Sequence, residues 1–223
     1  MKNHLFPKNC LNCHAEGTWL CESCSDSLFF IDAHFCPFCK TPAALFDVCG
    51  KCRRAIGAQK VFSLFSYSDP LARKIIKNFK YRYLQDMAEE LKPLFLKFIF
   101  KYKMLLEIKP DSILIPVPLH WYKERERGFN QAERIAQVIG KILSLPIDNK
   151  IINKKSRTKN QADIKMEERF ANLHGAFKIL KPPPKNIILV DDVFTTGSTV
   201  KEIASVLRFA GVENIQVITL ARG

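Results

Sequence analysis

The sequence ILVDDVFTTGST, from Ile188 to Thr199, decides the fold. Its apolar start predicts a strand buried on both faces, and the residues after it have helical spacing. Backbone N–H groups at the start of such a helix, around Gly197, bind anions. Hydroxyl donors are added by Thr195, Thr196, Ser198 and Thr199. The stretch therefore predicts a phosphate site at the carboxyl end of a strand.

Two adjacent carboxylates, Asp191 and Asp192, need a separate explanation, because they do not favour a phosphate directly. They can accept hydrogen bonds from hydroxyls such as those of a ribose, or hold Mg²⁺ through water. The whole stretch thus fits a ribose 5-phosphate. A simpler alternative is a capping box of Thr199 and Glu202, which explains only those two residues. A Walker nucleotide loop is excluded, since its Gly-x-x-x-x-Gly-Lys-Ser/Thr pattern does not occur.

The rest of the chain alternates between strand-like and helix-like apolar spacing. Asp69 and Pro70 are typical of a helix start, and Asn130 with Glu133 resembles a capping box. Strands are predicted at residues 61–67, 112–117, 176–180, 187–190 and 215–220, and helices at 71–79, 87–98, 130–142 and 200–207. This alternation predicts an α/β fold with an open, mainly parallel sheet flanked by helices.

All eight cysteines lie in the first 52 residues, as four Cys-x-x-Cys pairs. They are Cys10, Cys13, Cys21, Cys24, Cys36, Cys39, Cys49 and Cys52. Two intervening residues let both thiolates reach one metal, and a tetrahedral zinc takes two such pairs, so we expect two structural zinc ions. Sequential pairing is simplest, and the spacing also allows interleaved pairing. Disulfides, a redox pair and an iron–sulfur site explain the pattern less well.

The cysteine-bearing segment has only about 50 residues and few large apolar ones, and a segment of that kind needs bound metal to fold. We therefore expect a small zinc-ribbon module at residues 1–56, and a second domain at residues 57–223.

Lysine and arginine exceed aspartate and glutamate by 13, with 35 against 22. This favours an anionic partner such as nucleic acid, a polyphosphate or an acidic membrane surface, although a general lysine bias explains it equally well. Residues 1–7 lack the apolar core of a signal peptide, and the apolar stretch at residues 93–100 is too short and charged to cross a bilayer. We expect a cytoplasmic protein without membrane insertion.

The segment from Val190 to Thr199 resembles the signature of type I phosphoribosyltransferases. The resemblance implies that Asp191 and Asp192 bind the ribose hydroxyls of phosphoribosyl pyrophosphate (PRPP), with Mg²⁺. It also implies that the loop from Thr195 to Thr199 binds the 5-phosphate. PVPLHWYKERERGFNQA (Pro116 to Ala132) and RTKNQ (Arg157 to Gln161) resemble the ComF family, whose members join a zinc ribbon to a type I phosphoribosyltransferase-like domain.

This resemblance implies roles that the residues alone do not establish. Candidate pyrophosphate contacts are Leu119, His120, Arg125, Arg127, Arg157 and Lys159. The implied process is natural transformation, the uptake of single-stranded DNA into the cytoplasm. Implied partners are single-stranded DNA and a DNA translocase or helicase, which would bring the protein to the inner face of the membrane. The alternative is an active transferase similar to amidophosphoribosyltransferases, for which no catalytic residue stands out.

Overall fold

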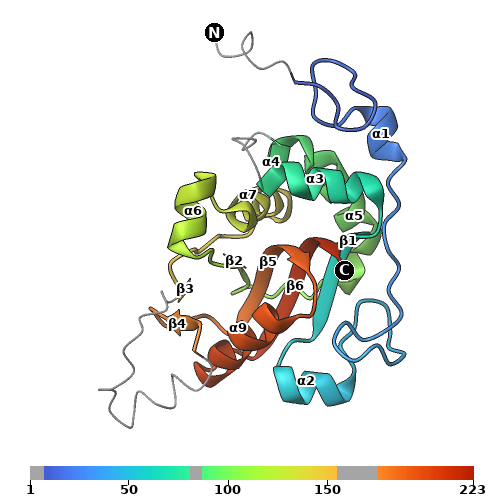
Figure 1. The fold of residues 1–223 in the computed structure, drawn as a ribbon. Coiled ribbons are helices and arrows are strands. Elements are labelled where there is room, and N and C mark those ends of the chain that lie inside the picture. Colours follow the sequence, from blue (N-terminus) through green and yellow to red (C-terminus); the bar gives the residue numbers. More distant parts are fainter. Residues whose placement is uncertain (1–7, 81–86, 155–174) are drawn as a thin grey trace.

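The computed structural model describes residues 8–80, 87–154 and 175–223, and a parallel four-stranded sheet lies at its centre (Figure 1). The strand order is β1–β6–β5–β2, and all three pairings are parallel. The strands are β1 Lys60–Ser66, β2 Ile113–Pro116, β5 Asn186–Phe194 and β6 Asn214–Arg222. The predicted α/β fold class is therefore confirmed.

Two strands differ from the prediction. Strand β5 continues to Phe194, so Asp191 and Asp192 lie within the strand and not in the turn after it. The strand predicted at residues 176–180 is the short β4 (Phe177–Ile179). It pairs antiparallel with β3 (Ile152–Lys154) in a separate two-stranded sheet. The small sheet contributes Lys154 to the site described below.

Helices pack on both faces of the main sheet. Ile188 and Val190 of β5 point into a core that also holds buried residues of α3, α4, α5 and α7. Ile187 and Leu189 point into the opposite core, with α9. This alternation explains why the β5 sequence is apolar without interruption. The helices are α1 Glu22–Asp26, α2 Gly50–Ile56, α3 Pro70–Lys80, α4 Met87–Glu90, α5 Lys92–Tyr102, η1 Lys103–Leu105, α6 Trp121–Arg127, α7 Gln131–Leu143 and α9 Ser198–Phe209.

Local signals place several helix starts. Asp69 Oδ1 accepts hydrogen bonds from the backbone N–H groups of residues 71 and 72, each 2.8 Å long, which confirms the predicted start of α3. Asn130 caps α7 through Ala132 N at 3.0 Å. Glu133 does not complete a capping box, because it accepts a hydrogen bond from Asn149. The helix predicted over residues 87–98 is divided into α4 and α5, since Pro93 near the start of α5 has no N–H to continue the first helix.

The cysteine-bearing segment runs along one side of the molecule (Figure 1). Its first loop lies beside α3 and α4, and its second lies at the other end, where α2 packs near α9. Between the loops, Ile31 N donates to Leu64 O of β1 at 3.0 Å. Within the second loop, the ring of Phe46 packs on Phe62 with centroids 5.0 Å apart. The buried residues of both loops thus belong to the same two cores as the sheet.

Within the described ranges, no helix is long and apolar enough to cross a membrane.

Candidate functional site

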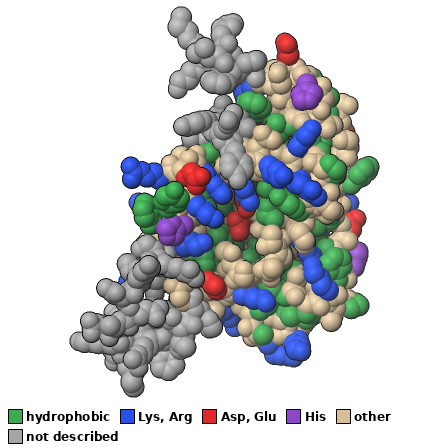
Figure 2. All heavy atoms as spheres, in the orientation of Figure 1, with side chains coloured by type: hydrophobic (Ala, Val, Ile, Leu, Met, Phe, Trp, Pro, Cys, Tyr) green, Lys and Arg blue, Asp and Glu red, His purple; other side chains and the backbone are tan. Residues whose placement is uncertain are grey.

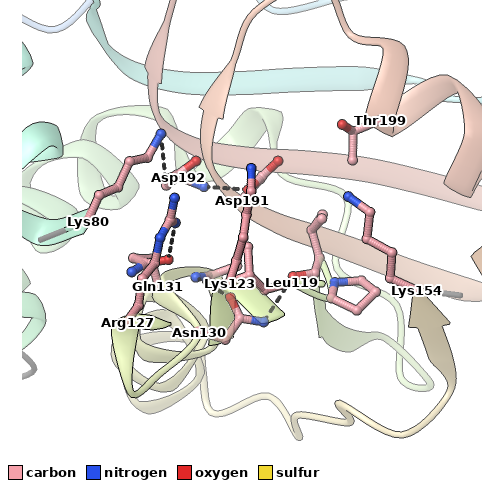
Figure 3. Close-up of a pocket in the computed structure, with 13 residues that line it drawn as sticks. Lys80, Leu119, Lys123, Arg127, Asn130, Gln131, Lys154, Asp191, Asp192 and Thr199 are labelled. Atoms are coloured by element: carbon pink, nitrogen blue, oxygen red, sulfur yellow. Dashed lines mark hydrogen bonds and ion pairs between the residues drawn. The ribbon is translucent and has the colours of Figure 1, made fainter. Parts of the chain in front are cut away.

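A cavity of about 170 Å³ lies at the carboxyl end of β5 (Figure 3). Its walls come from α3, the loop before α6, α6 itself, the start of α7, β3, β5 and the start of α9. The lining residues are Lys80, Val117, Pro118, Leu119, Lys123, Arg127, Asn130, Gln131, Ala132, Lys154, Asp191, Asp192 and Thr199. Its position agrees with the expectation that ligands of such sheets bind at the carboxyl ends of the strands.

The two adjacent carboxylates form the floor of this cavity. Asp191 Oδ1 accepts a hydrogen bond of 2.8 Å from the backbone N–H of Asp192, and Asp192 forms an ion pair with Lys80 at 3.0 Å. Burial, and next the charge of Asp192, raise the pKa of Asp191 to about 7, although Lys80 and Lys154 oppose the rise. Asp191 therefore titrates near neutral pH.

Four cations surround the acids: Lys80, Lys123, Arg127 and Lys154. Lys80 and Lys154 approach the acids from opposite sides (Figure 3). Arg127 donates to Gln131 Oε1 at 2.9 Å, which holds its guanidinium at the cavity wall. On the face shown in Figure 2, Lys and Arg side chains gather around a small acidic area. The arrangement can bind a ligand that carries both hydroxyls for the acids and phosphate charge for the cations.

Sequence reasoning did not single out Lys80 or Lys123 as site residues. Lys80 ends a helix and Lys123 lies in the first turn of another, where lysines are usually solvated. Lys123 lies in the segment from Pro116 to Ala132 that resembles the ComF family, but that resemblance gave it no role, and only the fold brings both lysines to the acids.

The predicted phosphate loop joins β5 to α9. Gly197 has a positive φ of 74°, and Ser198 N donates to Thr196 Oγ1 at 3.4 Å. Of the five loop residues from Thr195 to Thr199, Thr199 lines the cavity. Helix α9 begins at Ser198 without a side-chain cap, so the alternative of a Thr199–Glu202 capping box is wrong. The capping box fails because Thr199 is already inside the helix, where it cannot serve as the cap.

Only some of the candidate pyrophosphate residues that the structure describes line the cavity. Leu119 and Arg127 line the cavity. His120 instead caps α6, accepting a hydrogen bond of 3.3 Å from Tyr122 N, and Arg125 is exposed on α6, away from the lining. Arg157 and Lys159 lie outside the described residues.

The cysteines form two groups of four. In each group the sulfur atoms lie within 4.8 Å of one another. Four thiolates about 2.3 Å from one zinc are about 3.8 Å apart, so both groups fit a tetrahedral zinc. The groups follow the sequential pairing, which excludes the interleaved one: Cys10, Cys13, Cys21 and Cys24, then Cys36, Cys39, Cys49 and Cys52. All eight are free thiols and not disulfides.

Models of two protein families match separate parts of the chain. A model described as a double zinc ribbon domain matches residues 1–53. A model described as a phosphoribosyl transferase domain matches residues 125–223.

Several curated proteins are similar over nearly the whole chain. Competence protein F of Haemophilus influenzae is 30% identical, over 98% of this chain and 99% of its own. The DNA utilization protein YhgH of Escherichia coli K12 is 30% identical over 93% of this chain and 92% of its own. Competence protein ComFC of Bacillus subtilis is 28% identical over 91% and 84%.

Proposed function

The chain belongs to the ComF family of competence proteins. We propose that it binds PRPP with Mg²⁺ and acts in natural transformation, the uptake of single-stranded DNA into the cytoplasm. The observation that supports ligand binding best is the pair of acids near the carboxyl end of β5, surrounded by four cations, with the Gly197 turn five residues after Asp192. The family's zinc ribbons and phosphoribosyltransferase domain are both present in this chain.

In this proposal each part of the ligand has its own residues. Asp191 and Asp192 accept the ribose hydroxyls and hold Mg²⁺ through water. The 5-phosphate binds the loop of Thr195, Thr196, Gly197, Ser198 and Thr199. Lys80, Lys123 and Arg127 neutralise the pyrophosphate, with Leu119 at the same wall. His120, Arg125, Arg157 and Lys159 remain candidates by resemblance.

The DNA role is supported by the names of the relatives and by the net charge of +13. A strongly basic protein attracts single-stranded DNA through its phosphates. We propose a cytoplasmic site of action, with a DNA translocase or helicase as partner at the inner face of the membrane. The relatives' descriptions name competence and DNA utilization, so an active amidophosphoribosyltransferase-like enzyme is not favoured.

We also retain the division at residues 1–56 and 57–223 as a proposal. It is supported by the end of α2 at Ile56 and by Gly57, which reverses the chain with a φ of 91°.

Calorimetric titration of PRPP and Mg²⁺ tests the ligand site. We expect saturable binding to the wild type, and at least about tenfold weaker binding to Asp191→Asn/Asp192→Asn, because the ribose and Mg²⁺ lose their charged acceptors. The matched control is Asp26→Asn, an exposed acid paired with Lys97 far from the cavity. Equal binding by the folded double variant would refute the assignment of the acids. Titration of single-stranded DNA at rising salt tests the DNA role, which requires saturable binding that weakens with salt.

A further inference from the structure

The second cysteine group contacts the proposed phosphate loop through Phe38. Phe38 lies between Cys36 and Cys39, and its ring meets that of Phe194 edge-on, with centroids 5.4 Å apart. A Cβ on Gly197 would lie 2.6 Å from Phe38 Cε1 and 2.6 Å from Phe194 Cζ. The turn of the loop therefore rests on two rings, one of which the cysteine group holds in place.

The contact continues along α9, the helix that follows the loop. Lys201 Nζ lies over the Phe38 ring, 5.6 Å from its centroid. At the other end of the helix, a Cβ on Gly57 would lie 2.6 Å from Arg208 Cγ, so the segment after α2 approaches α9 closely. Cys36 is fully buried in the same core as Val200 of α9. The second cysteine group thus supports both the loop and the helix that carries it.

The first cysteine group has different neighbours. Cys10 and Cys24 are buried in the core on the opposite face of the sheet. Its loop is attached to α4 through Glu90, which accepts a hydrogen bond of 2.8 Å from Thr18 Oγ1 and one of 2.6 Å from Trp19 N. Helix α4 contributes none of the residues that line the cavity.

We propose that the second cysteine group, through Phe38, positions the loop from Thr195 to Thr199 for its ligand, whereas the first group does not. The inference deepens the proposed function, since the loop's ligand is taken to be PRPP. Zinc bound by Cys36, Cys39, Cys49 and Cys52 would hold the chain segment of Phe38 in one conformation. Gly197 has a positive φ, and a glycine can adopt many other backbone conformations as well. The loop therefore needs a contact from outside to hold its N–H groups in one arrangement.

Two pairs of variants test this. Cys13 and Cys39 are the exposed second cysteines of their groups, so Cys13→Ser and Cys39→Ser each remove one ligand from one site. Phe38→Ala leaves all cysteines in place, and its control is Phe35→Ala. Phe35 packs on Arg222, 4.5 Å from the guanidinium to the ring centroid, and the atoms nearest a Cβ on Gly197 belong to Phe194 and Phe38 instead.

The main measurement is hydrogen exchange of residues 194–201 without ligand, together with zinc content. We expect Cys39→Ser and Phe38→Ala to speed exchange about tenfold or more, since the loop loses its support. Cys13→Ser and Phe35→Ala should leave exchange within about twofold of the wild type. Phe38→Ala should keep its zinc, which separates the role of the ring from that of folding.

Titration with PRPP and Mg²⁺ is the second measurement. We expect Cys39→Ser and Phe38→Ala to bind about tenfold more weakly than their controls. Unchanged exchange in zinc-loaded Phe38→Ala, or equal exchange in Cys13→Ser and Cys39→Ser, would overturn the inference. A wild type that binds no PRPP would refute the proposed function alone, because the exchange comparison needs no ligand.

Discussion

The two cysteine loops repeat one pattern in the sequence but have different surroundings in the fold. Each presents four sulfur atoms within 4.8 Å of one another. The first loop is held by polar contacts to Glu90 on the α4 side, and the second by aromatic packing under Gly197. Two cysteine groups of the same kind can therefore pack on two faces of one sheet while only the second contacts the turn at Gly197.

The largest expected loss of stability comes from replacing a buried, zinc-binding cysteine of either group. Cys10 and Cys36 are both fully buried, so Cys10→Ser and Cys36→Ser should each release one zinc and lower the free energy of unfolding by several kcal/mol, because zinc binding drives folding of such segments. Chemical denaturation with zinc analysis measures both. If either variant released both zinc ions, the two groups would be one cooperative unit, and the comparison would fail.

An intermediate loss of stability is expected where polar contacts attach the first loop to α4. Glu90→Gln should cost about 1–3 kcal/mol, since the carboxylate accepts from Lys8 Nζ, Thr18 Oγ1 and Trp19 N. Urea unfolding followed by tryptophan fluorescence measures this loss, with Trp121→Phe in both proteins so that Trp19 alone emits.

The neighbouring Glu89→Gln is the control for that change. Glu89 forms an exposed ion pair with Lys141, worth at most about 1 kcal/mol. Exchange of residues 194–201 should not change in either variant. Faster exchange there in Glu90→Gln would connect the first loop to the phosphate loop, contrary to the comparison.

The last expected effect is a pH dependence of stability at the acid pair, which leaves both zinc sites and the loops unchanged. The folded pKa of Asp191 is about 7, above its ordinary value of 3.8, so its contribution to stability is present at low pH and is lost as pH rises through about 7. Asp191→Asn should therefore gain stability relative to the wild type between pH 5 and 7, by up to about 1.4 kcal/mol per pH unit, and the gain should level off above pH 7.

Thermal unfolding across this pH range checks the prediction, with Asp26→Asn as the exposed control. A difference between wild type and Asp191→Asn that stays constant with pH would show that Asp191 has an ordinary pKa.

Much of the site was predictable because its signals are local. Asp191, Asp192 and Gly197 lie within seven residues of sequence, and a buried strand followed by a helix places them near the carboxyl end of that strand. The capping box at Thr199 was wrong because α9 begins one residue earlier, at Ser198. His120 caps α6 and is not among the residues that line the cavity, so its contact with pyrophosphate stays a prediction.

The sequence by itself determined the four Cys-x-x-Cys pairs, the α/β class and the strand, turn and helix that carry Asp191, Asp192 and Gly197. Each depends on the spacing of residues a few positions apart, which local geometry converts directly into structure. Only the tertiary structure decided which cations face the acids and which cysteine loop supports the turn. Lys80 and Phe38 reach β5 and its turn across more than 100 residues of sequence, and such contacts arise from packing that no local pattern encodes.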